Sequence, residues 1–278
     1  MKGILKEGNT EIYKMLEIIE NKIKKSKSKE EKISILKEFL QILVLKILRD
    51  KNVFLNIAFI GGTCLRIVYD LKRYSEDLDF SLISKKGYDF LSLLDNLKKE
   101  LDLYNIQTDF KYKTGMVNNC FIKFKDVLQN FNLHHHRDEK LSIKLEIDTN
   151  PPNGATLEEK IVNNEFILNL ITYDLPSLMA GKLHAVMCRK YSKGRDFYDL
   201  LWYLTKKTTP NIKLLNNSII QTEKEDWKIT ETSWKEVLLK KIKTIDYKKV
   251  RNDVYPFLET KEEVELIRLS AYEGLLSS

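Results

Sequence analysis

Hydrophobic and polar residues alternate with two different periods along this chain, and these periods predict its helices and strands. In residues 10–25 and 28–50, apolar residues recur every three or four positions, as they do on a helix that buries one face. Ser28 and Glu31 open the second segment at the spacing of a capping box. Short apolar or alternating runs predict strands at residues 56–60, 77–83, 104–112, 119–125 and 141–148.

The pattern changes after residue 150. The run Asn-Pro-Pro-Asn-Gly at 150–154 consists of turn residues and ends the strand-rich part. Beyond Pro176 helical periodicity dominates, and the polar segment 206–226 is predicted to form a long loop. The predicted helices after the first two lie at residues 64–72, 87–102, 176–192, 194–206, 233–243, 246–257 and 261–275.

The composition is typical of a globular protein. With 278 residues, of which 43% are hydrophobic, the chain can bury a substantial core. Its cysteines, Cys64, Cys120 and Cys188, show no paired spacing, which indicates reduced thiols rather than a disulfide framework. The N-terminus lacks the apolar core of a signal peptide, and no run approaches the roughly 18 apolar residues of a membrane span. We therefore expect a cytoplasmic protein with no membrane partner.

Positive charge is concentrated in the second half of the chain. The net charge is +7, and residues 181–251 alone hold seventeen Lys and Arg against eight Asp and Glu. A basic C-terminal part would suit a polyanionic partner such as RNA. The alternative is a general enrichment in lysine without any nucleic-acid partner.

Residues 58–82 contain a turn that can approach phosphate closely. Gly61 and Gly62 follow a short apolar run and allow backbone angles that are closed to other residues, so amide groups and the Thr63 hydroxyl can reach phosphate oxygens. Apolar residues then recur at helical spacing, which places Thr63 near a helix N-terminus, where partial positive charge favours an anion. Taken alone, such a turn is as often a plain connection from strand to helix.

A pair of carboxylates follows the turn. Asp77 and Asp79 alternate with apolar residues, so they share one face of a strand with Cα atoms about 6.5 to 7 Å apart. Carboxylates at this separation can hold one or two Mg²⁺ ions together with substrate phosphates. In residues 141–148, Glu146 and Asp148 also share a face and offer a third carboxylate, and parity does not choose between them. An isolated Asp-x-Asp pair is more often a solvated strand face, but its combination with the glycine turn favours a metal site.

With these motifs the chain resembles the nucleotidyltransferase fold superfamily and, more narrowly, the AbiEii/AbiGii toxin family of type IV toxin–antitoxin systems. The family pattern of GGT followed by R-x-SED-x-D is present, and the signatures A-x-K-L and K-x-RD-x-YDL follow in the expected order. The resemblance spans roughly residues 59–204, and Gly181 stands where the family often has Glu. The matching residues are Gly61, Gly62, Thr63, Arg73, Ser75, Glu76, Asp77 and Asp79, then Ala180, Lys182, Leu183, Lys193, Arg195, Asp196, Tyr198, Asp199 and Leu200.

The resemblance implies both a fold and an activity. The fold is α/β (α+β), with a nucleotidyltransferase-type mixed sheet flanked by helices in residues 1–165 and a helical C-terminal domain in residues 166–278. The implied activity is that of a Mg²⁺- or Mn²⁺-dependent enzyme that transfers NMP from an NTP to an acceptor hydroxyl on RNA, such as tRNA, or on protein. Such an enzyme would act as the toxin of a toxin–antitoxin or abortive infection system, with a cognate antitoxin as partner.

The resemblance also assigns roles to individual residues. Asp77, Asp79 and Asp148 are predicted to bind the metal, with Glu146 as the alternative third carboxylate that helps activate the acceptor hydroxyl. Lys182 is predicted to contact nucleotide phosphates, and Asp196 to hold Lys182 or a substrate hydroxyl. Ser75 is also the position at which some family members carry a phosphate. The other predicted nucleotide contacts are Gly61, Gly62, Thr63, Arg66 and Ser75.

Each assignment has an alternative. In the second block, Lys182, Asp196 and Asp199 could form a salt-bridge network that only ties two helices together. Ser75 could simply form a hydrogen bond at the start of a strand. For the whole chain, the alternatives are a transferase that modifies a small molecule such as an aminoglycoside, and a non-catalytic module that binds an NTP or an antitoxin. A screen of acceptors separates the first alternative from the predicted activity, and NTP binding without turnover would favour the second.

Overall fold

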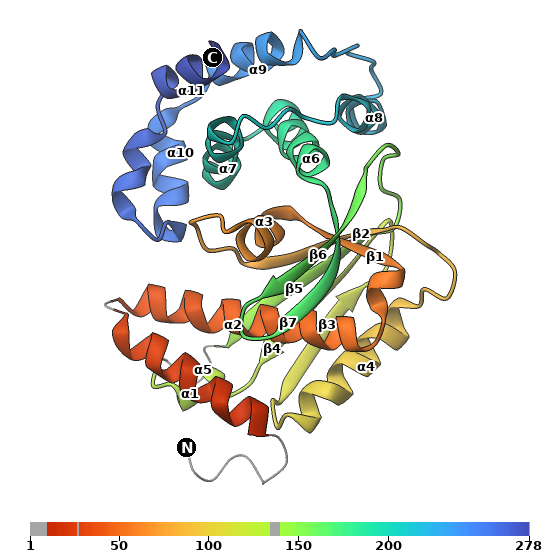
Figure 1. Ribbon diagram of the computed structural model, residues 1–278, viewed down its shortest axis with the longest axis vertical. Helices are drawn as coiled ribbons and strands as arrows, with labels where there is room; N and C mark the ends of the chain where they lie inside the picture. Colours follow the sequence, from red (N-terminus) through yellow and green to blue (C-terminus); the bar gives the residue numbers. More distant parts are fainter. Residues whose placement is uncertain (1–9, 27, 134–139, 278) are drawn as a thin grey trace. The chain divides into compact units, whose positions relative to one another are not determined.

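A computed structural model describes residues 10–26, 28–133 and 140–277 (Figure 1). The chain forms two compact units. The first comprises Met1–Phe59, Ser75–Asn150 and Glu159–Ile171, and the second comprises Ile60–Tyr74, Pro151–Glu158 and Thr172–Ser278. The predicted boundary after residue 165 divides the chain into two folding domains, and this division stays a prediction. Across the described ranges, no helix combines the length and the apolar character that crossing a bilayer requires.

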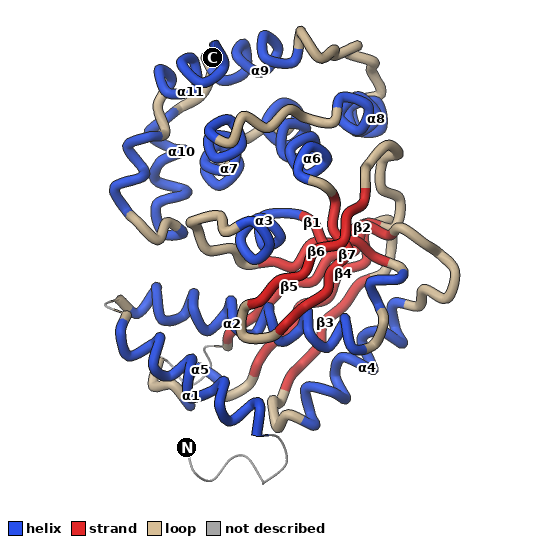
Figure 2. Tube along the Cα trace, viewed as in Figure 1, coloured by secondary structure: helices blue, strands red, loops and turns tan. Residues whose placement is uncertain are grey.

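The first unit is built around a mixed β-sheet (Figure 2). The strands follow the order β3-β4-β5-β2-β1-β7-β6 across the sheet. Strand β2 runs parallel to β5, whereas β4 is antiparallel to both β3 and β5. Together with the surrounding helices, this sheet confirms the expected α/β fold class. The strands are β1 (Ile57–Ile60), β2 (Asp77–Leu82), β3 (Thr108–Lys113), β4 (Val117–Phe124), β5 (Leu141–Asp148), β6 (Leu157–Asn163) and β7 (Ile167–Tyr173).

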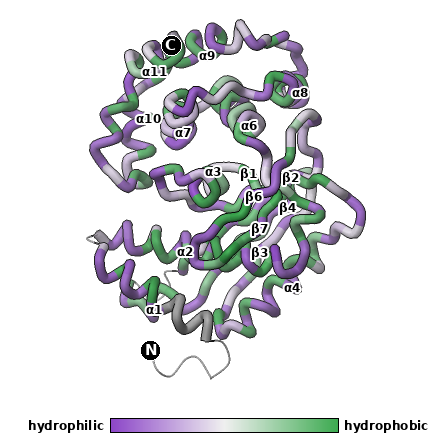
Figure 3. Tube along the Cα trace, viewed as in Figure 1, coloured by the Kyte–Doolittle hydropathy of each residue, from purple (hydrophilic) through white to green (hydrophobic). Residues whose placement is uncertain are grey.

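One face of the sheet is buried under helices. Strand β5 alternates strictly between buried and half-exposed residues, and its buried positions are all Leu or Ile. Helix α2 (Lys29–Asp50) packs against β5 and against α4 (Phe90–Leu103), which itself packs against β3. The strands and α2 are accordingly rich in hydrophobic residues (Figure 3). The opposite face of the strands is therefore left to the polar residues of the alternating pattern.

Local sequence signals set the ends of the helices in this unit. Ser28 caps α2 by accepting a hydrogen bond from the Glu31 amide at 3.1 Å, which confirms the predicted N-terminus. Asp89 caps α4 in the same way, with the amides of Leu91 and Ser92 as donors. The unit also contains α1 (Thr10–Lys25), the 3₁₀ helix η1 (Val53–Leu55) and α5 (Val127–Asn130).

The second unit is almost entirely helical. Helix α6 packs against α7 and α8, α7 also contacts α10 and α11, and α3 contacts α6. Asp174 and Asn211 cap α6 and α8, respectively, through their side chains. The elements are α3 (Gly61–Tyr69), α6 (Leu175–Cys188), α7 (Gly194–Thr205), α8 (Ile212–Glu223), α9 (Trp234–Ile242), α10 (Tyr247–Val254), α11 (Leu269–Ser277) and the 3₁₀ helices η2 (Tyr255–Phe257) and η3 (Lys261–Leu266).

Two predictions for the C-terminal half are wrong. The segment 206–226 is not a long loop, because α8 occupies most of it and buries Leu214, Leu215 and Ile219. The single helix predicted at 261–275 is instead η3 followed by α11, with a break around Ile267. The predicted strands include neither β6 nor β7. The charged sequence of β6 leaves only one of its residues buried, whereas β7 buries four.

Candidate active site

The carboxylates of the first sequence block lie on the polar face of the sheet, opposite the face that α2 and α4 cover. Asp77 and Asp79 on β2 are half-buried and alternate with the buried residues of that strand. In the parallel pairing with β5, Asp79 lies directly opposite Glu146, and Ser81 lies opposite Asp148. Adjacent strands are about 4.8 Å apart. The third carboxylate that parity left open is thus either the direct neighbour of Asp79 or the residue one pair further along the same face.

The contacts of these carboxylates differ. Glu146 forms an ion pair with Lys144, at 2.8 Å between Oε1 and Nζ. Asp148 accepts a hydrogen bond of 2.9 Å from the Asn150 amide through Oδ1. Among the residues that the structure describes, no three His, Cys, Asp or Glu side chains already converge as the ligands of one metal ion. To join Asp77 and Asp79 around a cation, Glu146 would have to turn away from Lys144.

The Gly-Gly-Thr turn forms the first turn of α3 in the second unit. Gly61 has a φ of 79°, a conformation that glycine adopts without the steric cost of a Cβ atom. The helix therefore begins directly after β1, three residues earlier than the predicted start at residue 64, and it ends at Tyr69 rather than at residue 72. Thr63 is fully buried. The predicted contacts of Gly61, Gly62 and Thr63 with phosphate stay predictions.

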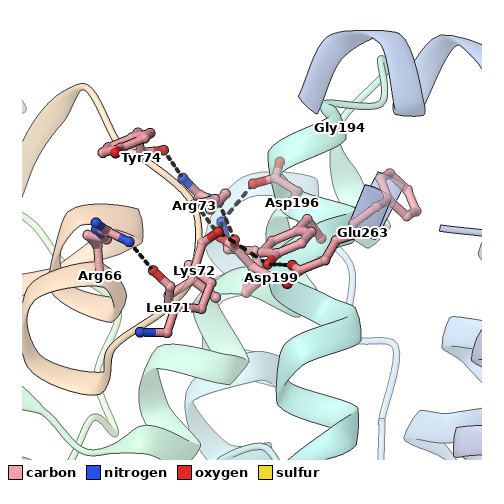
Figure 4. Close-up of polar contacts among 12 residues, drawn as sticks. Arg66, Leu71, Lys72, Arg73, Tyr74, Gly194, Asp196, Asp199 and Glu263 are labelled. Carbon is pink, nitrogen blue, oxygen red and sulfur yellow. Dashed lines mark hydrogen bonds and ion pairs between the residues drawn. The ribbon is translucent and has the colours of Figure 1, made fainter. Parts of the chain in front are cut away.

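The second sequence block forms a buried ion-pair network within the second unit (Figure 4). Lys182 on α6 places Nζ 2.7 Å from Asp196 Oδ1 and 2.8 Å from Asp199 Oδ2, both on α7. Asp199 also accepts two hydrogen bonds of 2.6 Å from Arg73, through Nε and Nη2. Arg189 donates to the second oxygen of Asp196. Three cations surround two carboxylates, so the network carries one net positive charge.

Burial and charge act in opposite directions on the network. Burial would raise the pKa values of Asp196 and Asp199, but the neighbouring cations outweigh it and hold both below their usual range. Burial would likewise lower the pKa of Lys182, but the two aspartates outweigh it and hold that pKa above its usual value. At neutral pH Lys182 is therefore an ammonium ion, which can attract phosphate but cannot act as a base.

The segment that contains Arg73 forms backbone hydrogen bonds with the C-terminal part of the same unit. Arg73 forms a β-bridge with Leu258, and the Tyr74 amide donates to the Phe257 carbonyl at 2.8 Å. In the sequence, only the family pattern marks Arg73, and nothing near it indicates its partner. Only the fold pairs Arg73 with Asp199, because 126 positions separate them in the sequence.

Arg66, which was predicted to contact the nucleotide, already has several protein partners. Its Nη2 lies 2.6 Å from Glu259 Oε1, its Nη1 donates to the Leu71 carbonyl at 3.0 Å, and its guanidinium carbon lies 4.9 Å from the centre of the Tyr74 ring. These contacts hold α3 and residues 71–74 together. A contact between Arg66 and a nucleotide stays a prediction.

Ser75 lies at the start of the first unit's second segment. Its carbonyl accepts a hydrogen bond of 3.1 Å from the side-chain amide of Gln41, a buried residue of α2. This bond anchors the chain two residues ahead of Asp77. The predicted roles of the Ser75 side chain in nucleotide binding and modification stay predictions.

A comparison with protein-family models matches a range of residues that includes both sequence blocks. Residues 43–271 match the model of the family described as nucleotidyl transferase AbiEii toxin, type IV TA system. The search of curated proteins finds no match.

Two solved structures from Helicobacter pylori share the fold. JHP933 is 18% identical, with a TM-score of 0.52 over 88% of this chain and 92% of its own. A protein described as a "putative nucleotidyltransferase" is 19% identical, with a TM-score of 0.54 over 88% of this chain and 95% of its own.

Proposed function

Because the chain belongs to the nucleotidyl transferase AbiEii toxin family of type IV toxin–antitoxin systems, we propose that it transfers NMP from a metal-bound NTP to an acceptor hydroxyl. The acceptor that the basic composition favours is RNA. In this reaction the acceptor oxygen forms a bond to the α-phosphorus, the bond to the leaving pyrophosphate breaks, and the hydroxyl proton passes to a carboxylate. The chain would act as a toxin, and its family implies a cognate antitoxin.

The observation that carries the proposal is the register of β2 and β5. Asp77, Asp79 and Glu146 are oxygen donors on one face of two paired strands, and Asp79 is directly opposite Glu146. Mg²⁺ prefers carboxylate oxygens combined with substrate phosphates, so these residues suit Mg²⁺, or Mn²⁺, better than a softer metal. Bound there, the metal would neutralise charge on the triphosphate. Either Glu146 or Asp148 would accept the proton of the attacking hydroxyl.

The second unit, taken by itself, holds the residues that are predicted to contact phosphate. Lys182 is held as an ammonium ion, and its network has one net positive charge that can be shared with an anion. The amide groups of the first turn of α3 point away from the helix and favour negative charge at that end. In this proposal Asp196 orients Lys182, and the predicted salt-bridge network and phosphate binding are compatible roles of the same residues.

The test is a transfer assay with the full chain. Each NTP, labelled at the α-phosphate, is incubated with Mg²⁺ and, separately, with total RNA, protein extract and a panel of aminoglycosides. We expect label on RNA, and we expect Asp77→Ala to reduce the rate on the order of 100-fold or more, because it removes a carboxylate aimed at the reacting charge. Asp95→Ala is the matched control, since Asp95 is an exposed aspartate on α4.

Three results would count against the proposal. Absence of transfer to every acceptor by the wild-type chain would refute it. Equal rates for the wild type and Asp77→Ala would refute the role of the carboxylates. Label on an aminoglycoside but not on RNA would show that the acceptor is a small molecule and not RNA.

A further inference from the structure

The polar face of the sheet continues beyond the carboxylates onto strands that no sequence motif marks. The pairing of β3, β4, β5 and β2 aligns residues in rows across the sheet. The first row runs from Lys111 through Phe121 and Lys144 to Asp77. The second row runs through Lys113, Asn119, Glu146 and Asp79. Because directly paired residues lie on the same face, each row joins a lysine on the edge strand to a predicted metal ligand.

These rows and Lys123 define what we call the lysine face, formed by Lys111, Lys113, Phe121, Lys123 and Lys144. The first four are exposed, and Lys144 is half-buried. The lysine face lies entirely within the first unit, in residues 75–150.

The β3 and β4 side of this face is strongly basic. Asp109, the acidic residue on this side, is already bound to two other lysines, with Oδ1 2.7 Å from Lys125 Nζ and Oδ2 3.7 Å from Lys140 Nζ. The hydrogen bond from Lys125 holds the pKa of Asp109 below its usual value. Asp109 thus leaves Lys111, Lys113 and Lys123 available to a polyanion.

Phe121 is a large aromatic residue placed where an outward-facing strand position is normally polar. Its side chain is 39% exposed, and Lys144 Nζ lies 5.7 Å from the ring centre. On its two sides in the row are Lys111 and Lys144. An exposed ring flanked by cations is the arrangement with which proteins stack the bases of single-stranded nucleic acids and bind the adjoining phosphates.

The order of the strands places the lysine face on one side of the predicted metal ligands and the Gly-Gly-Thr turn on the other. Strand β1, which leads into the Gly-Gly-Thr turn, lies on one side of β2, and β5 with its carboxylates lies on the other. If the acceptor hydroxyl reaches the third carboxylate on β5, an acceptor that extends towards β4 and β3 crosses the lysine face. Three strand spacings separate Asp79 from Lys113, about 14 Å. Stacked nucleotides are about 3.4 Å apart, so more than one nucleotide fits along this distance.

We propose that the lysine face binds a single-stranded segment of the acceptor RNA, with a base stacked on Phe121 and phosphates on Lys111 and Lys113. This inference rests on the proposed function, because it assumes that the acceptor hydroxyl approaches β5. It differs from the expectation based on composition, which placed RNA on residues 181–251. Duplex RNA should bind weakly, since its bases are already stacked on each other.

The test measures binding without turnover. The full chain is titrated into a fluorescein-labelled single-stranded RNA with a free 3′ hydroxyl, in Mg²⁺ and without NTP, and anisotropy gives Kd at several salt concentrations. Phe121→Ala should weaken binding roughly 5-fold to 100-fold. Phe121→Trp should retain wild-type affinity because it keeps the stacking surface, whereas Phe121→Leu, which is apolar but not aromatic, should resemble Phe121→Ala.

The lysines are tested by the dependence of affinity on salt. Loss of two phosphate contacts in the double variant Lys111→Ala, Lys113→Ala should lower the slope of log K against log salt by about 1.4. A fold defect alone would not change that slope selectively. The matched control is Lys98→Ala, Lys99→Ala, a pair of exposed lysines on α4.

Other outcomes overturn the proposal. It fails if the wild type does not bind the RNA, or if the Phe121 and lysine variants bind like the wild type. A loss confined to Lys248→Ala, Lys249→Ala on α10 would place RNA on the C-terminal part instead. RNA binding that depends on Phe121 while no acceptor is ever labelled would sustain the lysine face and refute the proposed transfer, so the two failures are distinguishable.

Discussion

The ion pair between Arg73 and Asp199 gives the sharpest prediction for the second unit. Both residues are essentially buried, at 2% and 0% exposure, and the two hydrogen bonds between them are each 2.6 Å long. Arg73→Met leaves Asp199 with Lys182 as its cation. Asp199→Leu leaves a buried guanidinium that still donates to the Tyr74 carbonyl at 3.0 Å. The double variant Arg73→Met, Asp199→Leu removes both charges.

The magnitudes follow from the cost of leaving one buried charge without its partner. Each single variant should lower the free energy of unfolding by about 3 to 5 kcal/mol, with Arg73→Met at the lower end because Lys182 still neutralises Asp199. The double variant should cost clearly less than the sum of the single variants, since apolar replacement of a buried pair is often close to neutral. The coupling energy between the two positions should be at least about 2 kcal/mol.

Urea unfolding of the full chain measures these values, with midpoint and slope analysed separately because two units need not unfold together. Lys240→Met is the control, since the i,i+4 pair of Lys240 and Glu236 is exposed and should contribute less than about 0.5 kcal/mol. If the two single variants each cost less than about 1 kcal/mol and their effects add, the pair is not buried and coupled as the structure has it, and the reasoning fails.

Two further predictions concern packing and pH in the same unit. A Cβ atom at Gly194 would lie 2.2 Å from the Val250 carbonyl oxygen, so Gly194→Ala should destabilise the protein by about 1 to 3 kcal/mol or more. A Cβ atom at Gly181 would have no atom within 4 Å, so Gly181→Ala should stabilise α6 by roughly 0.5 to 1 kcal/mol. Thermal melts of both variants check these two values. Because the folded-state pKa values of Asp196 and Asp199 are lowered, their stabilisation is present above pH about 4 and is lost as the pH falls through the folded values. Stability measured from pH 7 to pH 2 should therefore fall less steeply in Asp199→Asn than in the wild type, and parallel curves would contradict this.

Periodicity predicts most of the fold, because an element that buries one face has apolar residues at regular intervals in its sequence. The strand at 141–148 agrees with the structure to the residue, since every second position is apolar and buried. The same signal is weak where only part of an element is buried. Polar residues surround the few buried positions of α8, so its sequence indicates a loop. Strand β6 lies at the edge of the sheet and buries one residue, so its sequence does not indicate a strand.

In the candidate site too, the sequence predicts relations between neighbouring residues but not contacts between distant segments. The sequence places Asp77 and Asp79 on one face of a strand, because that relation involves only neighbouring residues. It cannot align Glu146 with Asp79, because strand register depends on the packing of the whole sheet. The pairing of Arg73 with Asp199 depends in the same way on contacts between distant segments.

Charge illustrates why the fold changes the location expected for RNA. Counted along the sequence, residues 181–251 are the most basic part of the chain, but Lys182 and Arg189 are already bound to carboxylates there. On β3, by contrast, Lys111 and Lys113 lie in rows that end at the predicted metal ligands. An acceptor that binds these lysines also comes close to the carboxylates that would activate its hydroxyl. Electrostatic attraction and chemical access therefore coincide on the lysine face, and this coincidence makes it the better candidate for the acceptor surface.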